Sequence, residues 1–121
     1  EVISVSTDSA YVHKAWHDQS DSVRKVRFPM LADHAGRVSR SYGAYMEETG
    51  QALRATIYID PGGIVRAFEF HNSDIGRSIQ EIVRKLQAAI YVREHKGEVC
   101  PMNWKPGAKT LKPGVDLVGK I

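Results

Sequence analysis

The stretch from residue 78 to residue 97 constrains the fold most, because it predicts one long amphipathic helix with a signal at each end. Ser78 followed by Glu81 has the form of a capping box, which marks a helix start. Gly97 lies where a left-handed residue commonly follows a helix. The apolar residues between these signals recur at spacings of three and four, which places them on one helical face: Ile79, Ile82, Val83, Leu86 and Ile90.

A hairpin is predicted directly before this helix. Residues 55–60 and 64–70 are rich in the β-branched and aromatic residues that strands prefer. Pro61, Gly62 and Gly63 separate the two runs, and they form a connector of the length and chemistry that hairpins use.

The N-terminal part predicts a strand followed by a helix. Residues 1–6 have the composition of a buried strand, and residues 7–9 offer side chains that can cap a helix continuing to residue 18. The β-branched residues of the strand are Val2, Ile3 and Val5. The apolar residues of the helix share one face: Tyr11, Val12, Ala15 and Trp16.

Shorter elements follow in the middle of the chain. We expect a strand over residues 28–32, a turn over residues 33–36, a helix over residues 38–45 and a loop over residues 47–50. The resulting order, β-α-β-α-β-β-α with a tail, indicates an α/β fold. Within the tail, residues 115–118 are expected to dock as an edge strand or an arm.

Length and composition narrow the class of protein. A chain of 121 residues is expected to form one domain, and 42% hydrophobic with 26% charged residues is ordinary for a soluble globular protein. The net charge of +3 comes from scattered lysines and arginines, which argues against a nucleic-acid partner. No apolar run approaches the roughly 18 residues of a membrane span, and no signal peptide is visible. A chain that opens on a strand without Met is expected to be a piece of something longer.

Cys100 is the single cysteine and lies in a segment with glycines and prolines on both sides. Pro101 and Pro106 prevent a helix from continuing, so we expect an irregular and partly exposed segment. One cysteine excludes an internal disulfide and fits a reducing compartment. Two interpretations stay open from the residues alone: a thiol that moves to meet a partner sulfur, or a free cysteine that only packs.

Two histidine-based sites are weakly indicated. His13 and His17 share a helix face at metal-site spacing, but no glutamate lies between them in the metalloprotease pattern and the sequence offers no third ligand. A polar helix face is the simpler interpretation. Cys100 and His95 are five residues apart, which says nothing about a nucleophile pair in space. We therefore predict no metal and no cofactor.

Two arginines stand at the ends of core elements. Arg54 precedes the first strand of the predicted hairpin, and Arg77 precedes the long helix. A guanidinium fixed in such a place can stabilise a thiolate and orient an oxygen substrate through forked hydrogen bonds. The alternative for each is an ordinary surface arginine.

Five blocks of the chain, in order, resemble the typical two-cysteine peroxiredoxins, and most of all the peroxidase component of bacterial alkyl hydroperoxide reductases. The blocks are residues 1–9, 13–17, 54–64, 75–78 and 97–107. The similarity runs from residue 1 to residue 121, and the Val-Cys-Pro segment after a long helix is its most specific part. The resemblance implies a thioredoxin-like α/β fold whose N-terminal strands and peroxidatic helix are missing here. Residues 1–96 would form an incomplete core and residues 97–121 an extended tail.

The resemblance also implies roles. The family reduces hydrogen peroxide and organic hydroperoxides with thiols. Cys100 matches the resolving cysteine, which forms an intersubunit disulfide with the sulfenic acid of a partner subunit. Arg54 matches the arginine that holds the peroxidatic thiolate and the peroxide, and Arg77 matches a second, supporting arginine. The upstream Pro-x-x-x-Thr-x-x-Cys motif of the peroxidatic cysteine is absent from this sequence.

Further expectations follow from the same resemblance. We expect a cytoplasmic antioxidant enzyme that forms homodimers and a decamer, with a flavin disulfide reductase or a thioredoxin-type protein as electron donor. Residues 22–27 replace the Gly-Gly-Leu-Gly insertion of oxidation-sensitive members, and residues 116–121 lack their Tyr-Phe pair, which predicts an enzyme that resists overoxidation. The alternative is a non-catalytic thioredoxin-like module that supports oligomerisation or binds a client protein.

Overall fold

The computed structural model describes residues 1–120, and the chain divides into two compact units. The first unit comprises Glu1–Ala55 and Glu69–Gly76, and the second comprises Thr56–Phe68 and the chain from Arg77 onward. The predicted boundary after residue 96 stays a prediction, because these units divide the chain by contacts and not by the extent of the tail.

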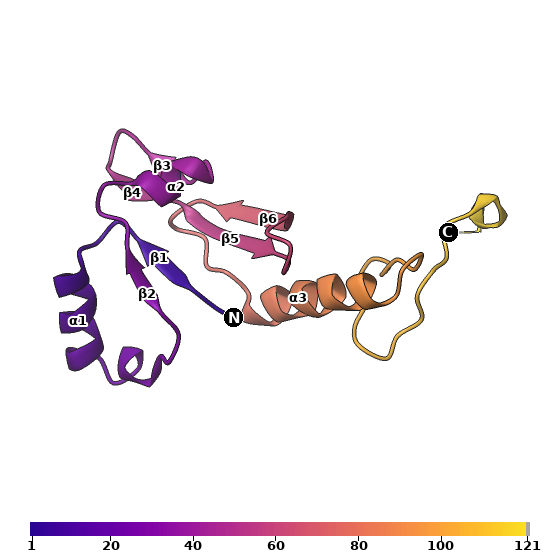
Figure 1. Cartoon of the computed structure of the whole chain (residues 1–121), viewed down its shortest axis with the longest axis horizontal. Helices are drawn as coiled ribbons and strands as arrows, with labels where there is room; N and C mark the ends of the chain where they lie inside the picture. The colour runs from indigo at the N-terminus through magenta and orange to yellow at the C-terminus, as the bar shows by residue number, and fades with distance from the viewer. Residues whose placement is uncertain (121) are drawn as a thin grey trace. The chain divides into compact units, whose positions relative to one another are not determined.

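The first unit begins with two strands that pair in parallel, β1 (Ser4–Ser6) and β2 (Met30–Ala32). Helix α1 (Ala10–Gln19) and a 3₁₀ turn (Val23–Lys25) connect them, and α1 packs against β2 (Figure 1). A helical crossover is the usual connection between parallel strands. The strand, helix and strand predicted for this region are confirmed, with shorter strands than expected.

Helix α1 begins as predicted but buries a different face. The Ser9 side chain accepts a hydrogen bond from the Val12 backbone N–H at 3.3 Å, which caps the helix. The apolar face expected to pack is largely exposed: Tyr11 is 88% exposed and Trp16 55%. The buried residue of α1 is His13. The predicted buried strand is also wrong in this respect, because Val2 and Ile3 are more than half exposed.

A buried carboxylate organises the turn between β2 and α2 (Arg37–Ser41). One oxygen of Asp33 accepts from the Val38 N–H at 3.1 Å, and the other accepts from the Ser39 N–H and hydroxyl, both at 2.8 Å. These bonds satisfy donors of the first helical turn, as a capping carboxylate does. The turn predicted over residues 33–36 is confirmed by the bond from the Gly36 N–H to the Asp33 carbonyl at 2.7 Å.

The helix predicted over residues 38–45 is too long, because its last residue belongs to a small hairpin. Tyr45–Met46 (β3) pairs antiparallel with Gln51–Ala52 (β4), and the predicted loop over residues 47–50 connects them. The Arg40 guanidinium lies over the Tyr45 ring at 3.9 Å and binds both oxygens of Glu47 at 2.6 and 2.9 Å. This contact joins α2 to the hairpin.

The larger hairpin is confirmed as strands β5 (Arg54–Ile59) and β6 (Val65–His71), which pair in a two-stranded sheet (Figure 1). Asp60 fixes the turn: one oxygen accepts from the backbone N–H groups of Gly62 and Ile64 at 2.8 and 3.0 Å, and the other accepts from Arg66 at 2.7 Å. Such local bonds from an aspartate to following amides are characteristic of tight turns.

Helix α3 (Ile79–Glu94) is the longest element, and it begins where the sequence predicts. The Ser78 hydroxyl accepts from the Glu81 N–H at 3.3 Å. Its apolar stripe is nevertheless largely exposed, up to 70% at Ile79, and Ile82 alone among the five is of intermediate burial. The buried apolar residues within residues 1–120 are Ala44, Tyr58 and Trp104. The described sheets each have two strands, so they offer little surface on which a larger core could form.

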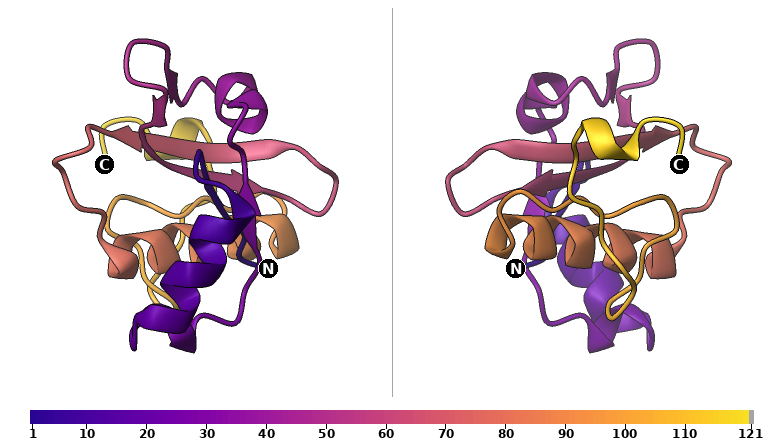
Figure 2. Two further views of the ribbon diagram at one scale, coloured as in Figure 1. Left: turned by 90° about the vertical axis from the view of Figure 1, so that its left-hand side faces the viewer. Right: turned by 90° about the vertical axis from the view of Figure 1, so that its right-hand side faces the viewer.

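The first part of the tail turns back to α3, where Arg84 donates to the carbonyl of Trp104. The chain after α3 is drawn from orange to yellow in Figure 2. The edge strand expected over residues 115–118 is wrong, because Val115–Leu117 form a 3₁₀ turn, and the alternative of a docked arm stays a prediction. Pro113 precedes this turn and has no backbone N–H with which to extend a strand ladder. Among the helices of residues 1–120, none has the length and apolarity needed to cross a bilayer.

Candidate functional site

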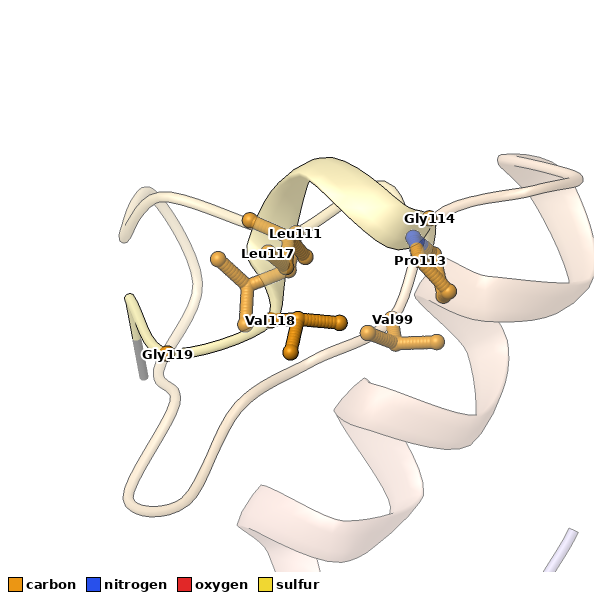
Figure 3. Close-up of a pocket in the computed structure, with 7 residues that line it drawn as sticks. All are labelled: Val99, Leu111, Pro113, Gly114, Leu117, Val118 and Gly119. Atoms are coloured by element: carbon orange, nitrogen blue, oxygen red, sulfur yellow. The ribbon is translucent and has the colours of Figure 1, made fainter.

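Cys100 lies in a partly exposed position immediately after a short backbone bridge. The Val99 N–H donates to the Leu111 carbonyl at 2.9 Å, and the Leu111 N–H donates back to the Val99 carbonyl at 3.0 Å. Val99 and Leu111 also line an open apolar cavity with Leu117 and Val118 from the end of the tail (Figure 3). Val99, directly before the thiol, is therefore bound to the later part of the tail, residues 111–118.

Glu98 ties the same stretch to the helix as well. Its Oε2 atom accepts a hydrogen bond from the Tyr91 hydroxyl of α3 at 2.9 Å. The same oxygen accepts a hydrogen bond from the Thr110 hydroxyl of the tail. These two donors lower the pKa of Glu98, Thr110 most and Tyr91 next, so the carboxylate is charged at neutral pH.

Trp104 anchors the chain on the C-terminal side of the thiol. The side chain is 3% exposed, and its Nε1–H donates to the Ala108 carbonyl at 3.1 Å. Its ring lies 5.0 Å from that of Tyr91, tilted by 52°. Asn103, directly before it, has a left-handed backbone with φ of +60°, which turns the chain there.

Arg84 joins this anchor to α3. It donates to the Trp104 carbonyl at 3.1 Å, while Glu81 holds its other guanidinium nitrogens at 2.6 and 2.7 Å. Burial raises the pKa of the Cys100 thiol, nearby Arg84 lowers it and nearby Glu98 raises it, with a net increase. Cys100 is therefore a protonated thiol at neutral pH.

The three residues predicted for the site fall in different units. Arg54 belongs to the first unit, where its Nε–H donates to the Ser73 carbonyl at 2.5 Å. Arg77 and Cys100 belong to the second unit, one directly before the capping Ser78 of α3 and the other after the helix. Their roles at a shared site stay predictions.

The histidines of α1 have different environments. His13 is buried, with Nε2 at 2.6 Å from the Ser6 hydroxyl, so the predicted polar helix face is wrong at this position. His17, one helical turn further on, is only partly exposed, and its ring lies 3.9 Å from Asp18. Within residues 1–120 no three His, Cys, Asp or Glu side chains gather as a metal site would require.

His95 is engaged with the helix. Its ring stacks on Tyr91 at 3.9 Å, and its Nδ1 lies 2.9 Å from the Tyr91 carbonyl. This geometry gives no support to a nucleophile pair of His95 with Cys100.

Sequence reasoning missed the residues that hold Cys100 in place: Tyr91, Glu98 and Thr110. They are distant in sequence or lie outside any periodic pattern, so spacing alone gave no sign that they meet. Arg84 left a weak signal, because it follows Glu81 by three residues on a helix, the spacing of an ion pair.

Two family descriptions match the chain. The AhpC/TSA family matches residues 1–68, and the C-terminal domain of 1-Cys peroxiredoxin matches residues 90–120. The chain therefore belongs to the AhpC/TSA family of peroxiredoxins. The predicted peroxiredoxin family and the predicted thioredoxin-like α/β fold are both confirmed.

Individual relatives agree with this assignment. Alkyl hydroperoxide reductase C of Staphylococcus epidermidis is 50% identical over 120 residues, which are 99% of this chain and 64% of the relative. The crystal structure of Enterococcus faecalis AhpC is 46% identical, covers 84% of this chain and 60% of its own, and superposes with a TM-score of 0.80. The reduced 2-Cys peroxiredoxin of Plasmodium vivax is 33% identical, covers 96% of this chain and 61% of its own, and gives a TM-score of 0.88. The chain thus spans 64% of the length of the curated relatives it matches.

Proposed function

We propose that this polypeptide works as part of a thiol peroxidase that reduces hydrogen peroxide and organic hydroperoxides, with Cys100 as the resolving thiol. The observation that carries the proposal is the setting of Cys100. It lies beyond the long helix α3, in a partly exposed segment bounded by glycines and prolines, and its thiol pKa is raised. A resolving thiol needs reach more than it needs a low pKa.

The chemistry proceeds in two balanced steps. A peroxidatic thiolate attacks one peroxide oxygen, the O–O bond breaks, and the products after protonation are an alcohol or water and a sulfenic acid. The Cys100 thiol then attacks the sulfenic sulfur, which forms a disulfide and releases water. The 121 residues hold one cysteine, so the peroxidatic thiol comes from outside them. A dithiol donor reduces the disulfide and is itself oxidised.

Arg54 and Arg77 are assigned to the peroxidatic site. The bond from Arg54 Nε to the Ser73 carbonyl fixes the guanidinium at the start of β5, and its terminal nitrogens form the fork that suits an oxygen substrate. Arg77 directly precedes the capping Ser78, so the start of α3 fixes its backbone. A guanidinium beside the peroxidatic sulfur would keep that sulfur as a thiolate.

The same proposal includes the assembly and the partners. We assign a homodimer that closes into a decamer, a cytoplasmic location, and a flavin disulfide reductase or a thioredoxin-type protein as donor. The names of the relatives support peroxidase chemistry in general and leave the choice between donors to experiment.

The test uses protein that carries both residues 1–121 and the peroxidatic thiol. Equimolar hydrogen peroxide should convert it to a disulfide-linked dimer on a non-reducing gel, and Cys100→Ser should abolish that dimer. Arg54→Ala should slow peroxide consumption by about a hundredfold or more, because the charge that stabilises the thiolate and the transition state is lost.

Two outcomes would overturn the proposal. A disulfide-linked dimer that persists in Cys100→Ser would remove the role given to Cys100. An intact mass of 13.5 kDa, the mass of these residues alone, with no peroxide consumed would favour the non-catalytic module.

A further inference from the structure

One oxygen atom near Cys100 links helix α3 to a later part of the tail. Glu98 Oε2 receives the Tyr91 hydroxyl from α3 and the Thr110 hydroxyl from the tail, and Glu98 stands two residues before the thiol. The adjacent bridge between Val99 and Leu111 continues the same tie to the tail. A movement that carries residues 98–100 away from α3 together breaks the contact between Glu98 and Tyr91.

The disulfide of the proposed function requires such a movement. A disulfide places its two sulfur atoms about 2.05 Å apart, so the thiol has to come out of its partly buried position to meet a sulfur of another chain. The bonds that hold it are unequal. The backbone bonds of Val99 are neutral amide contacts, and the bond from Arg84 to the Trp104 carbonyl is charge-assisted but has a single acceptor on the C-terminal side of the thiol. On the N-terminal side, one carboxylate oxygen of Glu98 accepts from both α3 and Thr110.

We propose that Glu98 is the positioning residue of Cys100, and that loss of its two hydroxyl contacts is the step that frees the thiol. This inference rests on the proposed function for its biological meaning, but it concerns the conformation of the chain itself. Hydrogen bonds to a carboxylate are roughly twice as strong as neutral ones, which keeps the segment closed at rest. Both hydroxyl donors can turn to water instead, so opening leaves no buried donor without a partner.

Trp104 provides a signal for the open state. When residues 98–104 are held against α3, the Trp104 ring is buried and packs near Tyr91. Trp104 follows Cys100 in the sequence, whereas Glu98 precedes it. Release of the segment moves an indole from an apolar setting into water, which shifts its emission to longer wavelength. The second tryptophan, Trp16, lies in the other unit and is already 55% exposed, so it contributes a constant background.

The experiment measures the rate at which N-ethylmaleimide alkylates Cys100 in the polypeptide of residues 1–121, whose single cysteine makes the reading unambiguous. Glu98→Gln removes the charge, and we expect alkylation to accelerate on the order of tenfold, the effect of losing about one charged hydrogen bond. Tyr91→Phe and Thr110→Val each remove one donor and should accelerate it about threefold. Glu98→Asp keeps the charge and should recover part of the slow rate.

Glu94→Gln is the matched control. Glu94 lies near the same end of α3, is exposed, and pairs with the neighbouring Arg93 at 3.1 Å. This variant should leave both alkylation and Trp104 emission unchanged. The far-ultraviolet helix signal is recorded for every variant, so that opening of the segment is distinguished from unfolding of the chain.

Three results would overturn the inference. Equal alkylation rates in Glu98→Gln and Glu94→Gln would show that the carboxylate holds nothing. Fast alkylation without a change in Trp104 emission would show that the segment does not open as a unit. Loss of the helix signal in Glu98→Gln, with an unchanged rate in Thr110→Val, would assign Glu98 a purely structural role. None of these measurements uses peroxide, so failure of the proposed function appears only in the dimer assay.

Discussion

Two carboxylates, one in each unit, hold a turn of the chain in place by different means. Asp33 is buried and receives two backbone N–H groups and one hydroxyl, all from residues within six positions of it. Glu98 receives two hydroxyls, one seven residues before it in α3 and one twelve residues after it in the tail. The first arrangement is local and made mainly of backbone, and the second joins distant segments through side chains.

This difference indicates which turn can open. The amide donors of Val38 and Ser39 point at Asp33 because α2 begins there, so they cannot leave without unwinding the helix. The hydroxyls of Tyr91 and Thr110 sit on rotatable bonds and can exchange the carboxylate for water. We infer that the Asp33 turn is a fixed part of the structure, whereas the Glu98 contacts can be made and broken while α3 stays intact.

The largest predicted effect is on the fixed turn. Gly36 has φ of +67°, and a Cβ there would come within 2.4 Å of the Tyr45 ring and 2.9 Å of Arg40. Gly36→Ala should therefore lower the free energy of unfolding by about 3 kcal/mol, from the left-handed backbone and the clash together. Chemical denaturation followed by circular dichroism measures it.

Gly43→Ala separates the two causes. Gly43 has nearly the same φ, +69°, but a Cβ there would meet no atom within 4 Å. Gly43→Ala should lower the free energy of unfolding only by the cost of the left-handed backbone, about 1–2 kcal/mol. Equal losses in the two variants would mean that the space around Gly36 does not matter.

An intermediate effect is expected from acid. Hydrogen bonds led by the Ser39 N–H lower the pKa of Asp33, so its contribution to stability is complete above the ordinary aspartate pKa of about 3.9 and is lost as the pH falls through the lowered value. Asp33→Asn should remove this contribution at pH 7 and flatten the pH dependence below pH 4. Thermal unfolding from pH 7 to pH 2 tests the sign, and a variant that still loses stability as steeply as the parent would contradict it.

The smallest effect is expected from the releasable segment. Trp104→Phe keeps an aromatic ring near Tyr91 but loses the hydrogen bond to the Ala108 carbonyl. The cost should be about 1 kcal/mol, with Cys100 alkylated no more than about threefold faster. A loss as large as that of Gly36→Ala would show that this segment is as fixed as the Asp33 turn.

Elements with local signals could be predicted from the sequence. The hairpin β5–β6 was indicated by its two runs of strand-forming residues and the Pro-Gly-Gly connector, and α3 by Ser78 and its periodic apolar residues. Strands β3 and β4 were not, because each has two residues and leaves no periodic pattern. Residues 115–118 have the composition of a strand, but Pro113 and Gly114 before them set a turn instead.

The candidate site shows the same limit. The setting of Cys100 in an irregular segment could be predicted from its neighbours in the chain, because proline and glycine act locally, whereas its role was suggested only by the family resemblance. Its partners could not be predicted, because Glu98 meets Tyr91 and Thr110 only when α3 and the tail are folded. The predicted burial of Trp16 and Tyr11 is wrong for a related reason. Periodicity indicates which residues share a helix face, but the whole fold determines what covers that face.

The backbone of Asn103 has a consequence for how related sequences can be interpreted. Its φ of +60° is tolerated by glycine and asparagine and is costly for β-branched residues. In a relative with valine or isoleucine at this position, we therefore expect a different backbone conformation. Its tryptophan, and the cysteine four residues before that tryptophan, should then lie elsewhere. One residue type, compared across natural sequences, would then sort family members by the shape of this loop before any of their structures is determined.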